Sequence, residues 1–503
     1  MTAEQTPPRR RRTVDVALES RLRRWTIEDQ DGQVTLIDSA AVPAGEPFAG
    51  DVPLHVGYGG VMRIAVLAGG AADLERVLRR AVLASGAELV LLLHANDARS
   101  FTERAAALRD ARPDLVLVLA AERREADRIV DLVEALRFGC ADQSPAPRVV
   151  VAGDAHAALR LKAAAATFAV ELLSDPRRPD GLSAFAHRGR DFRRGTDPNV
   201  VLRDEALEEL ARLVAARGSD ALVVDVSGGS TSLVRASVRG AVTAAHVAPL
   251  GSGVAADRTV VRAGLDGVRR WIPWSIDAPT MLERVFNRAR WPDAVAAEAS
   301  ALALEIALAH EATSHAHADA AAAGMADALR DAPITIVTGA AASFTRVAHT
   351  ALVAIDGLAS RRPTTLYRDA DEGLVALAAV AAHIRSAGGD PASAVGDELA
   401  RRLVPIALVV PVTPGRRSRL RVNGIEYRAD ELVPGAFFSV RHRGDADVEV
   451  TGTPVKTRGT AGELGIIIDA RGRPLALPAR DAERIPALVK WFAALDLAVT
   501  GLS

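Results

Sequence analysis

The sequence predicts an α/β protein made of two lobes and a small C-terminal β-rich domain. Apolar strand-like runs alternate with amphipathic helical runs between residues 62 and 152, and this alternation is typical of parallel strands joined by crossover helices. A second series of strands and helices starts near residue 198. From about residue 401, short apolar runs separated by Gly, Pro and Asn turns indicate a β-domain.

Composition and charge limit the class of protein. The chain has 503 residues, of which 49% are hydrophobic and 25% charged, so it can bury the cores of two to four globular domains. Its 62 basic side chains are balanced by 63 acidic ones, which gives no global reason to expect nucleic acid or a membrane as a partner. No apolar run reaches the roughly 18 residues that span a bilayer, and no apolar signal segment follows the first residues. We therefore expect a cytoplasmic protein, in which the single cysteine, Cys140, is a buried thiol.

The first lobe is expected over residues 13–197, after a basic tail at residues 1–12. We interpret the tail as disordered, with a tether to nucleic acid or membrane as the alternative. Residues 13–60 are predicted to be extended and turn-rich. Strands are then expected at residues 62–67, 88–93, 114–119 and 148–152, with helices at 72–84, 100–111 and 124–137 between them. Residues 175–196, rich in Arg, Pro, Gly and Asp, are predicted to form a long loop.

The second lobe is expected over residues 198–400 and the β-rich domain over residues 401–503. The lobe should contain helix 204–215, strands 222–226, 233–236 and 242–250, helical segments 280–289 and 294–323, strand 334–337 and helix 372–386. The last domain should contain strands at 406–412, 419–422, 425–429, 437–441, 447–450 and 464–469, followed by helix 482–495.

The turn between the first two strands of the second lobe carries the strongest chemical signal. Asp225 lies near the end of the first strand, and the turn that follows consists of Gly228, Gly229, Ser230 and Thr231. Small residues let a phosphate approach backbone N–H groups, hydroxyls can donate to it, and a carboxylate can hold Mg²⁺ through water. ATPases of the actin, Hsp70 and sugar-kinase types build half of their phosphate clamp in this way. The alternative is an ordinary hairpin whose turn merely needs glycine.

A second turn of small residues, Gly339, Ala340 and Ala341, directly follows strand 334–337. In a two-lobed ATPase of the actin or Hsp70 type, such residues lie against the adenosine, where a larger side chain would occupy the space of the nucleotide. The order of the two turns, with a helical segment between them, favours an actin-like fold. Its cofactor would be ATP or ADP, with Mg²⁺ held through water by Asp225.

The turn at residues 225–231 resembles the phosphate turn of the MutL-type (GlmL) proteins, which are encoded beside the cobalamin-dependent enzyme glutamate mutase and are unrelated to the mismatch-repair protein. The resemblance continues in scattered blocks over most of the chain, at residues 59–66, 263–265, 270–274, 284–292, 305–312 and 465–475. This family is placed with the actin-like ATPases and assists the mutase. The resemblance therefore implies an accessory protein with a nucleotide site and a cobalamin-dependent mutase as its protein client.

The chain departs from the family pattern within the expected nucleotide site. The family opens with an Asp-x-Gly-Ser-Thr turn, whereas no glycine follows Asp15 here, and Leu18 and Glu19 would bring bulk and negative charge toward a triphosphate. In the second lobe, Ser227 replaces a glycine and Ser232 replaces an acidic residue. Because phosphoryl transfer depends on positioning by both halves of the clamp, the sequence predicts a degenerate site without hydrolysis. Retained binding with slow turnover is the alternative.

Three functions stay open at this point. The preferred one is an accessory protein that supports a partner enzyme through a degenerate nucleotide site. The first alternative is a competent Mg-dependent ATPase, a chaperone or reactivase, in which Asp15 faces Asp225 across an open cleft that neither Leu18 nor Glu19 fills. The second is a scaffold without nucleotide that binds proteins through segment 269–291 and the C-terminal domain. The chain lacks the Asp-x-His-x-x-Gly pattern of cobalamin sites, so we expect it to carry no cobalamin itself.

Other clusters have structural interpretations beside functional ones. His310 and His317 lie on one predicted helix, where a metal site is geometrically possible and ordinary helix histidines are the alternative. The tryptophans and arginines of segment 269–291 are suited to stacking on a base, to a protein interface, or to a packed core with cation–π pairs. Asp369, Asp371 and Glu372 precede a helix and predict capping of its N-terminus.

Overall fold

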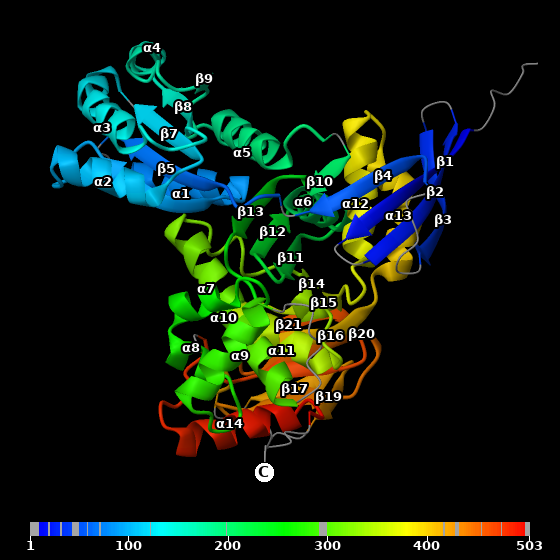
Figure 1. The fold of residues 1–503 in the computed structure, drawn as a ribbon. Helices are drawn as coiled ribbons and strands as arrows, with labels where there is room; N and C mark the ends of the chain where they lie inside the picture. The colour runs from blue at the N-terminus through cyan, green and yellow to red at the C-terminus, as the bar shows by residue number, and fades with distance from the viewer. Residues whose placement is uncertain are drawn as a thin grey trace, which may run out of the picture.

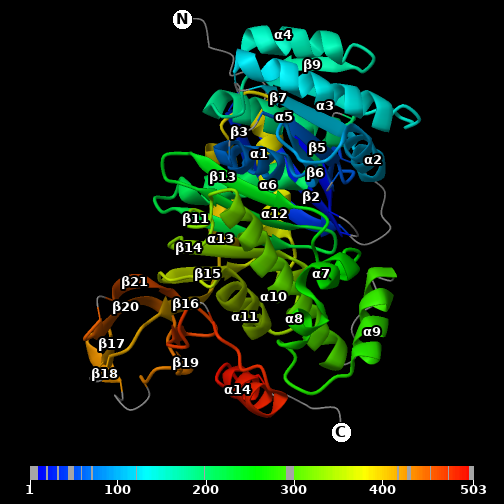
Figure 2. The ribbon, with the colours of Figure 1, turned by 90° about the vertical axis from the view of Figure 1, so that its left-hand side faces the viewer.

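The computed structural model describes residues 10–18, 21–30, 33–42, 50–57, 59–69, 72–120, 122–197, 199–290, 299–415, 418–427, 432–453, 455–473 and 475–497. Its described strands form four sheets. In Figure 1 the N-terminal sheet (blue) and a cyan domain lie on either side of the upper part of the molecule, above a central green sheet, with the C-terminal strands (orange) at the bottom. Figure 2, turned by 90°, shows the same stacking from the cyan domain down to helix α14.

The first-lobe sheet has the order β10-β4-β1-β2-β3. It consists of β1 (Arg10–Leu18), β2 (Arg21–Gln30), β3 (Gln33–Val42), β4 (Val52–Gly57) and β10 (Val200–Leu202). The first three strands form an antiparallel meander, and β4 and β10 continue the sheet in parallel. Val14, Val16 and Leu18 alternate along β1 and are buried in the core, as their period of two requires. Of the predicted tail, residues 1–9 lie outside the described residues and Arg10 begins β1.

The second-lobe sheet repeats this topology. Its strands β11 (Ala221–Val226), β12 (Thr231–Ala236), β13 (Val242–Val247), β14 (Ile334–Gly339) and β15 (Thr364–Arg368) have the order β13-β12-β11-β14-β15. Again an antiparallel meander is continued by two parallel strands. Two sheets with this duplicated order form the two lobes of actin- and Hsp70-type ATPases. The predicted two-lobed actin-like α/β fold is thereby confirmed.

Two helices join the lobes at their shared core. They are α6 (Arg203–Ala215) and α12 (Gly373–Ser386), which pack against each other. Their apolar residues form one buried cluster with strands of both sheets, and α13 (Pro391–Arg402) covers the same side. Asp369 accepts the N–H groups of Leu374 and Val375, and Asp371 accepts that of Gly373, which confirms the predicted capping of α12 for these two residues. The side chain of Glu372 makes no capping hydrogen bond and binds Arg203 instead.

A separate α/β domain stands between β4 and β10. Its strands β5 (Arg63–Ala68), β6 (Glu88–His94), β7 (Leu115–Ala120), β8 (Arg148–Gly153) and β9 (Val170–Leu173) are all parallel, in the order β6-β5-β7-β8-β9. Helices α1 (Ala72–Ser85), α2 (Phe101–Ala111), α3 (Ala126–Gly139) and α4 (Ala155–Ala164) and the short η1 (Arg123–Glu125) connect them. The predicted parallel sheet with crossover helices is confirmed, but it is distinct from the first-lobe sheet.

The prediction of a long loop over residues 175–196 is wrong, because helix α5 (Pro179–Arg194) occupies most of it. Proline occupies the first helical turn, where its missing N–H costs nothing. Phe185 is buried in the core of the inserted domain, and Leu182, one helical turn before it, packs against that core. The arginines suggested a solvated loop, but Arg190, Arg193 and Arg194 form ion pairs with acidic side chains of α6.

Helices of the second lobe fill the segment between β13 and β14 and cover the sheet. They are α7 (Ala256–Ala263), α8 (Leu265–Arg269), α9 (Ala278–Arg290) and α10 (Ala299–Ala322), with η2 (Ala340–Ala342) and α11 (Val347–Leu358) after β14. Trp271 is buried, donates to Glu311 and stacks on His310, which favours the packed-core interpretation of this segment. His317 instead contacts the carbonyl of Ala326, so the two imidazoles have different neighbours. Trp291 lies outside the described residues.

The C-terminal segment is divided between two sheets. β16 (Pro405–Pro411), β22 (Ile466–Asp469) and β19 (Phe437–Val440) extend the second-lobe sheet, while β17 (Arg419–Val422), β18 (Ile425–Tyr427), β20 (Gly444–Thr451) and β21 (Val455–Ala461) form a four-stranded antiparallel sheet. Helix α14 (Asp481–Ala493) returns to the second lobe, where Arg484 donates to the carbonyls of residues 269, 270 and 272. In the part of the chain that the structure describes, no helix has the length and apolarity to cross a bilayer.

Candidate functional site

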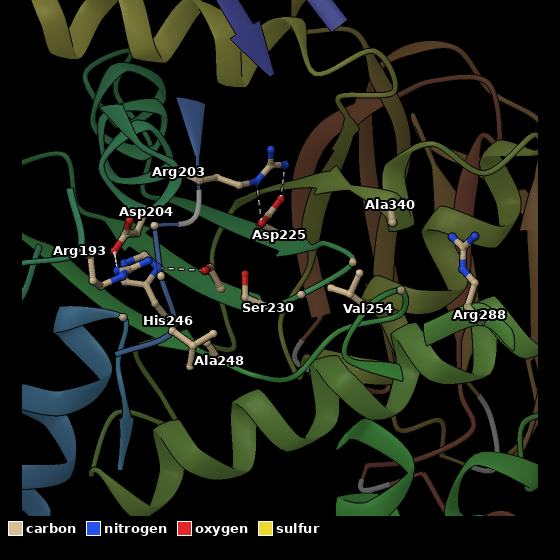
Figure 3. Close-up of a pocket in the computed structure, with 18 residues that line it drawn as sticks. Arg193, Arg203, Asp204, Asp225, Ser230, His246, Ala248, Val254, Arg288 and Ala340 are labelled. Atoms are coloured by element: carbon tan, nitrogen blue, oxygen red, sulfur yellow. Dashed lines mark hydrogen bonds and ion pairs between the residues drawn. The ribbon is translucent and has the colours of Figure 1, made fainter. Parts of the chain in front are cut away.

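A cavity of about 660 Å³ opens beside the predicted phosphate turn (Figure 3). Both lobes and the inserted domain contribute to its walls. The lining residues are Gly59, Gly60, Val61, Gly86, Arg193, Arg203, Asp204, Asp225, Gly228, Gly229, Ser230, Ser232, His246, Ala248, Gly253, Val254, Arg288 and Ala340. Asp225, Gly228, Gly229, Ser230 and Ala340 were predicted from the sequence, and the fold brings them together here. We call this cavity the cleft.

The turn between β11 and β12 presents donors to the cleft. Ser227 closes it, since its N–H donates to the carbonyl of Ser230 and its Oγ accepts the N–H of Ser230 at 3.1 Å. The N–H groups of Gly228 and Gly229 donate to no described residue, and both glycines are half-buried at the cleft wall. Adjacent N–H groups in such a turn form a concave site for an anion. The serine that replaces the family's glycine thus stabilises the turn rather than obstructing it.

A second glycine-containing loop, at residues 251–253, packs against the turn. The N–H of Gly253 donates to the carbonyl of Gly228 at 3.0 Å, and a Cβ on Gly253 would lie 2.8 Å from the Cα of Gly228. A Cβ on Gly251 would lie 2.6 Å from the carbonyl oxygens of residues 227 and 228. Glycine is therefore required at both positions for this close approach.

Asp225 is completely buried, and the side chains of Arg203 and Thr338 donate hydrogen bonds to it. Arg203, in the first turn of α6, donates from Nε to Oδ2 at 3.0 Å and from Nη2 to Oδ1 at 2.7 Å. Thr338 donates to Oδ1 at 2.6 Å. The same Nη2 of Arg203 also binds Glu372 at 2.7 Å. The guanidinium of Arg203 thus neutralises Asp225 with a bidentate fork, the strongest form of such a pair.

The second predicted turn lies against the same carboxylate. Gly339 has a φ of +75°, and a Cβ there would lie 2.8 Å from Oδ1 of Asp225, so glycine is required. Ala340 lines the cleft. Ala341 is buried in the second-lobe core, and Thr231 is buried with its hydroxyl donating to the carbonyl of Leu250. Neither of the last two lines the cleft.

Asp15 does not join the cleft, which corrects its predicted place in the clamp. It is fully buried and accepts hydrogen bonds from Nε and Nη2 of Arg24, at 2.7 and 2.9 Å, and from the N–H of Gly50. The cause is the hairpin, because the β1–β2 register pairs Leu18 with Arg21 and leaves only two residues for the turn. Asp15 therefore lies three residues before the end of β1, whereas Asp225 lies one residue before the end of β11. Leu18 is buried in the shared core and does not fill the cleft; Glu19 lies outside the described residues.

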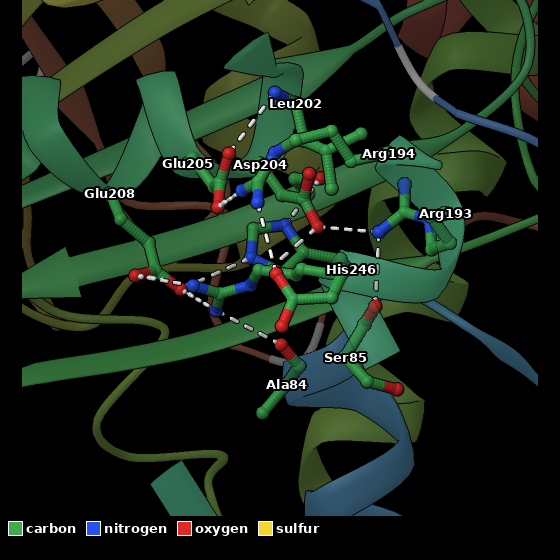
Figure 4. A network of polar contacts seen from close by, with 12 residues as sticks. Ala84, Ser85, Arg193, Arg194, Leu202, Asp204, Glu205, Glu208 and His246 are labelled. Atoms are coloured by element: carbon green, nitrogen blue, oxygen red, sulfur yellow. Dashed lines mark hydrogen bonds and ion pairs between the residues drawn. The ribbon is translucent and has the colours of Figure 1, made fainter. Parts of the chain in front are cut away.

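A polar cluster forms one wall of the cleft (Figure 4). Arg193 at the end of α5 donates to Asp204 at 2.5 Å, and His246 on β13 contacts Ser232 through Nδ1 at 2.9 Å. Nε2 of His246 lies 3.6 Å from Glu208. Two buried atoms of this wall, Oδ1 of Asp204 and Nε2 of His246, lack a hydrogen-bond partner among the described residues. Because Nε2 of His246 faces Glu208, only Oδ1 of Asp204 is left, among the described residues of this wall, as a buried polar atom that could accept from a ligand or a water molecule.

Charges in this wall keep its carboxylates ionised. Burial alone would raise the pKa of Glu208, but the facing imidazole of His246 and the guanidinium of Arg190 lower that pKa to about 2. Burial alone would also raise the pKa of Asp204, but the attraction of the Arg193 guanidinium is the stronger effect and lowers that pKa. The wall is therefore a network of paired charges at neutral pH.

The cleft fits a phosphate group better than it fits a magnesium ion at Asp225. The free N–H groups of Gly228 and Gly229 and the hydroxyl of Ser230 are suited to phosphate oxygens. By contrast, both oxygens of Asp225 accept from Arg203, which leaves them poor ligands for a water shell around Mg²⁺. Among the described residues, no group of three or more His, Cys, Asp and Glu side chains is arranged to hold a metal ion.

Comparison with known proteins gives weak likenesses only. No family model matches the chain, and no curated protein matches its sequence. The PPX-GPPA enzyme of Aquifex aeolicus matches over 67% of this chain and 70% of its own, at 11% identity and a TM-score of 0.19. A second structure of the Aquifex aeolicus Ppx/GppA family member covers 67% and 68%, at 12% identity and a TM-score of 0.19. The nucleotide-free structure of acetone carboxylase, solved for the mechanism of ATP-dependent acetone carboxylation, covers 74% and 70%, at 10% identity and a TM-score of 0.28.

Several residues of the cleft escaped the sequence analysis. Arg203 and Arg193 stand in arginine-rich stretches where nothing distinguishes them from surface arginines. His246 lies within a predicted strand and carries no motif. A detectable signal did exist in Gly251 and Gly253, which follow β13 as two glycines separated by one serine, the pattern of a loop with close backbone contact.

Proposed function

We propose that this protein is an accessory protein of the actin-like ATPase fold that binds a nucleotide in its cleft, does not hydrolyse it efficiently, and supports a partner enzyme. One observation carries the proposal: the carboxylate expected to organise Mg²⁺ is held by Arg203 and Thr338 instead. Catalysis of phosphoryl transfer depends on metal ions and a positioned water. A cleft that keeps the phosphate-binding turn and neutralises Asp225 is suited to binding without turnover.

The first lobe supports the same proposal. In the sequence-based scheme, the β1–β2 turn supplies the other half of the phosphate clamp, yet the register leaves two residues there against four in the β11–β12 turn. Asp15, the acid expected beside it, is bound to Arg24 and Gly50. Gly59, Gly60 and Gly86 line the cleft, whereas no described residue of the β1–β2 hairpin is among its lining residues.

The identity of the partner enzyme is proposed from the sequence resemblance alone. The MutL-like blocks of the sequence favour a cobalamin-dependent mutase as the partner, and the chain itself is proposed to carry no cobalamin. A direct test is to inactivate a purified glutamate mutase from the same organism and add this protein with Mg·ATP. Recovery of mutase activity above that seen with serum albumin supports this client, and no recovery excludes it.

The nucleotide is tested by isothermal titration with Mg·ATP and Mg·ADP. Gly60→Glu is the informative variant, because Gly60 lines the cleft and a Cβ there has no heavy atom within 4 Å. The new carboxylate should weaken binding of a polyphosphate roughly tenfold. Gly396→Glu is the matched control, since a Cβ on Gly396 is equally unobstructed and this residue lies on α13, outside the cleft lining. Failure to bind at about 1 mM nucleotide, a free energy near −4 kcal/mol, would leave only the scaffold alternative.

A competent ATPase remains the second candidate, and Asp204 favours it. This buried carboxylate lines the cleft, and its Oδ1 has no partner in the described structure, so it is placed to orient a water molecule. A phosphate-release assay separates the candidates. The proposal expects release at the rate of the blank, whereas release that Asp204→Asn removes and Gly396→Glu preserves would establish hydrolysis.

A further inference from the structure

A second cavity, of about 530 Å³, lies behind the polar wall of the cleft. It is enclosed by α1, the turn before α5, one face of α5, the middle of α6 and strand β13. Its lining consists of Val77, Arg80, Ala84, Pro176, Arg177, Arg178, Pro179, Leu182, Ser183, Ala186, His187, Arg190, Glu208, Arg212, Gly240, Val242, Thr243, Ala244 and Met325. Glu208 belongs to this lining and to the polar wall of Figure 4, so the wall separates the two cavities. We call the second cavity the arginine pocket.

The lining of the arginine pocket contains more basic than acidic side chains. Five arginines line it, at positions 80, 177, 178, 190 and 212, against a single lining carboxylate, Glu208. Glu208 is already shared, because it binds both Arg190 and Arg212. Arg177 pairs with Asp175 just outside the lining. Arg190 also lies 4.0 Å from Asp204, and Arg212 lies 3.3 Å from Glu209. The positive charge left over in this lining is therefore that of Arg80 and Arg178.

Two of the five arginines stand at the rim with their guanidinium groups available. Arg80 on α1 and Arg178 before α5 are exposed, and neither forms an ion pair with a described residue. They belong to different elements and converge on the same cavity. Like charges brought together repel by about 1 kcal/mol at 4 Å even in water, and more near a protein surface. Arg178 acts on Asp175 without forming an ion pair with it, and no described carboxylate forms an ion pair with Arg80. Two basic side chains on one cavity, neither of them in an ion pair, favour an anion in that cavity.

The size and chemistry of the pocket define its ligand. Guanidinium forks match the paired oxygens of phosphate and carboxylate groups. A volume of about 530 Å³ is within the range of small-molecule sites. Leu182, Ala186, Ala244 and Met325 add apolar lining beside the charges. We propose that the arginine pocket binds a small molecule with two or more phosphate or carboxylate groups, held at the rim by Arg80 and Arg178. This site is independent of nucleotide binding in the cleft.

Titration calorimetry with two simple probes tests the site. Inorganic pyrophosphate represents the phosphate source and citrate the carboxylate source, each titrated into the full chain at low salt. Arg80→Glu/Arg178→Glu should weaken the bound probe at least roughly tenfold, because two charge-assisted contacts become repulsive. The control, Arg109→Glu/Arg421→Glu, makes the same change of net charge at exposed arginines of α2 and β17. It should bind the probe as the wild type does.

Further variants locate the probe and check the fold. Gly60→Glu, which adds charge to the cleft, should leave probe binding unchanged. The rim variant should melt within about 2 °C of the control, because both sites are exposed and surface substitutions change stability little. Three results would overturn the proposal: wild-type affinity in the rim variant, an equal loss in the control, or absence of binding by both probes at about 1 mM. Loss of the probe in Gly60→Glu would place the anion in the cleft and also refute it.

Discussion

The ion pairs of Arg203 give the sharpest test of the structure, because Arg203→Ala and Asp225→Ala should destabilise the protein by different amounts. Arg203 is 3% exposed and serves two buried carboxylates, on Asp225 and Glu372. Arg203→Ala leaves both without their cation, and removing one member of a buried pair costs about 3–5 kcal/mol. Asp225→Ala leaves Arg203 bound to Glu372 and removes the acceptor of Thr338, a loss of about 1–3 kcal/mol. The arginine substitution should therefore destabilise the protein more than the aspartate substitution.

Urea unfolding followed by tryptophan fluorescence measures this difference as a shift of the transition midpoint. Arg79→Ala is the control, because Arg79 pairs with Glu75 on the exposed face of α1 and such pairs contribute well under about 1 kcal/mol. Arg203→Lys should fall between wild type and Arg203→Ala, since lysine keeps the charge and loses the bidentate fork. A midpoint for Asp225→Ala at or below that of Arg203→Ala would refute the shared pairing.

Three further predictions concern other buried groups. Burial raises the pKa of Asp369 to about 7. The resulting contribution of Asp369 to the free energy of unfolding is fully present below about pH 4 and is lost as the pH rises through 7. Asp369→Asn should abolish this part of the pH dependence, measured as urea midpoints at pH 5 and pH 8. Burial raises the pKa of Cys140 to about 11, so the native protein should not react with Ellman's reagent at pH 8, and one thiol should appear in guanidinium chloride. Arg471 is buried between Asp356 and Asp469 and lies over the rings of Phe437 and Trp491; Arg471→Met should cost about 3–5 kcal/mol in urea unfolding, whereas a loss below about 1 kcal/mol would contradict these contacts.

Local sequence patterns predicted most strands but not their grouping. Apolar runs such as residues 62–67 and 114–119 identify buried strands because burial on both faces leaves no room for polar residues. They do not identify which strands pair, so the inserted domain could not be separated from the first-lobe sheet. Helix α5 was missed for a related reason. Its arginines resemble those of a solvated loop until their partners on α6, such as Asp204 and Glu208, are known.

In the candidate site, too, local features were predictable from the sequence and long-range contacts were not. The turn at residues 227–231 was predictable because glycine and serine within a short segment determine its geometry. Its supporting loop leaves a similar signal in Gly251 and Gly253. Arg203 could not be predicted, because it lies 22 residues from Asp225 and 169 residues from Glu372 and its pairing exists only once α6 and α12 pack together. Asp15 was misplaced because the sequence shows the residue but not the hairpin register.

The pairing of Arg203 also bears on how the lobes move. Arg203 directly follows β10, a strand of the first-lobe sheet, whereas Asp225 lies on β11 of the second-lobe sheet and Glu372 precedes α12. The three side chains therefore crosslink the lobes at the base of the cleft, through contacts of 2.7 to 3.0 Å. Rotating one lobe away from the other would separate these buried charges, and breaking a buried ion pair is costly. Within the function proposed above, this crosslink would resist separation of the lobes, as a cleft that holds its ligand without turnover requires.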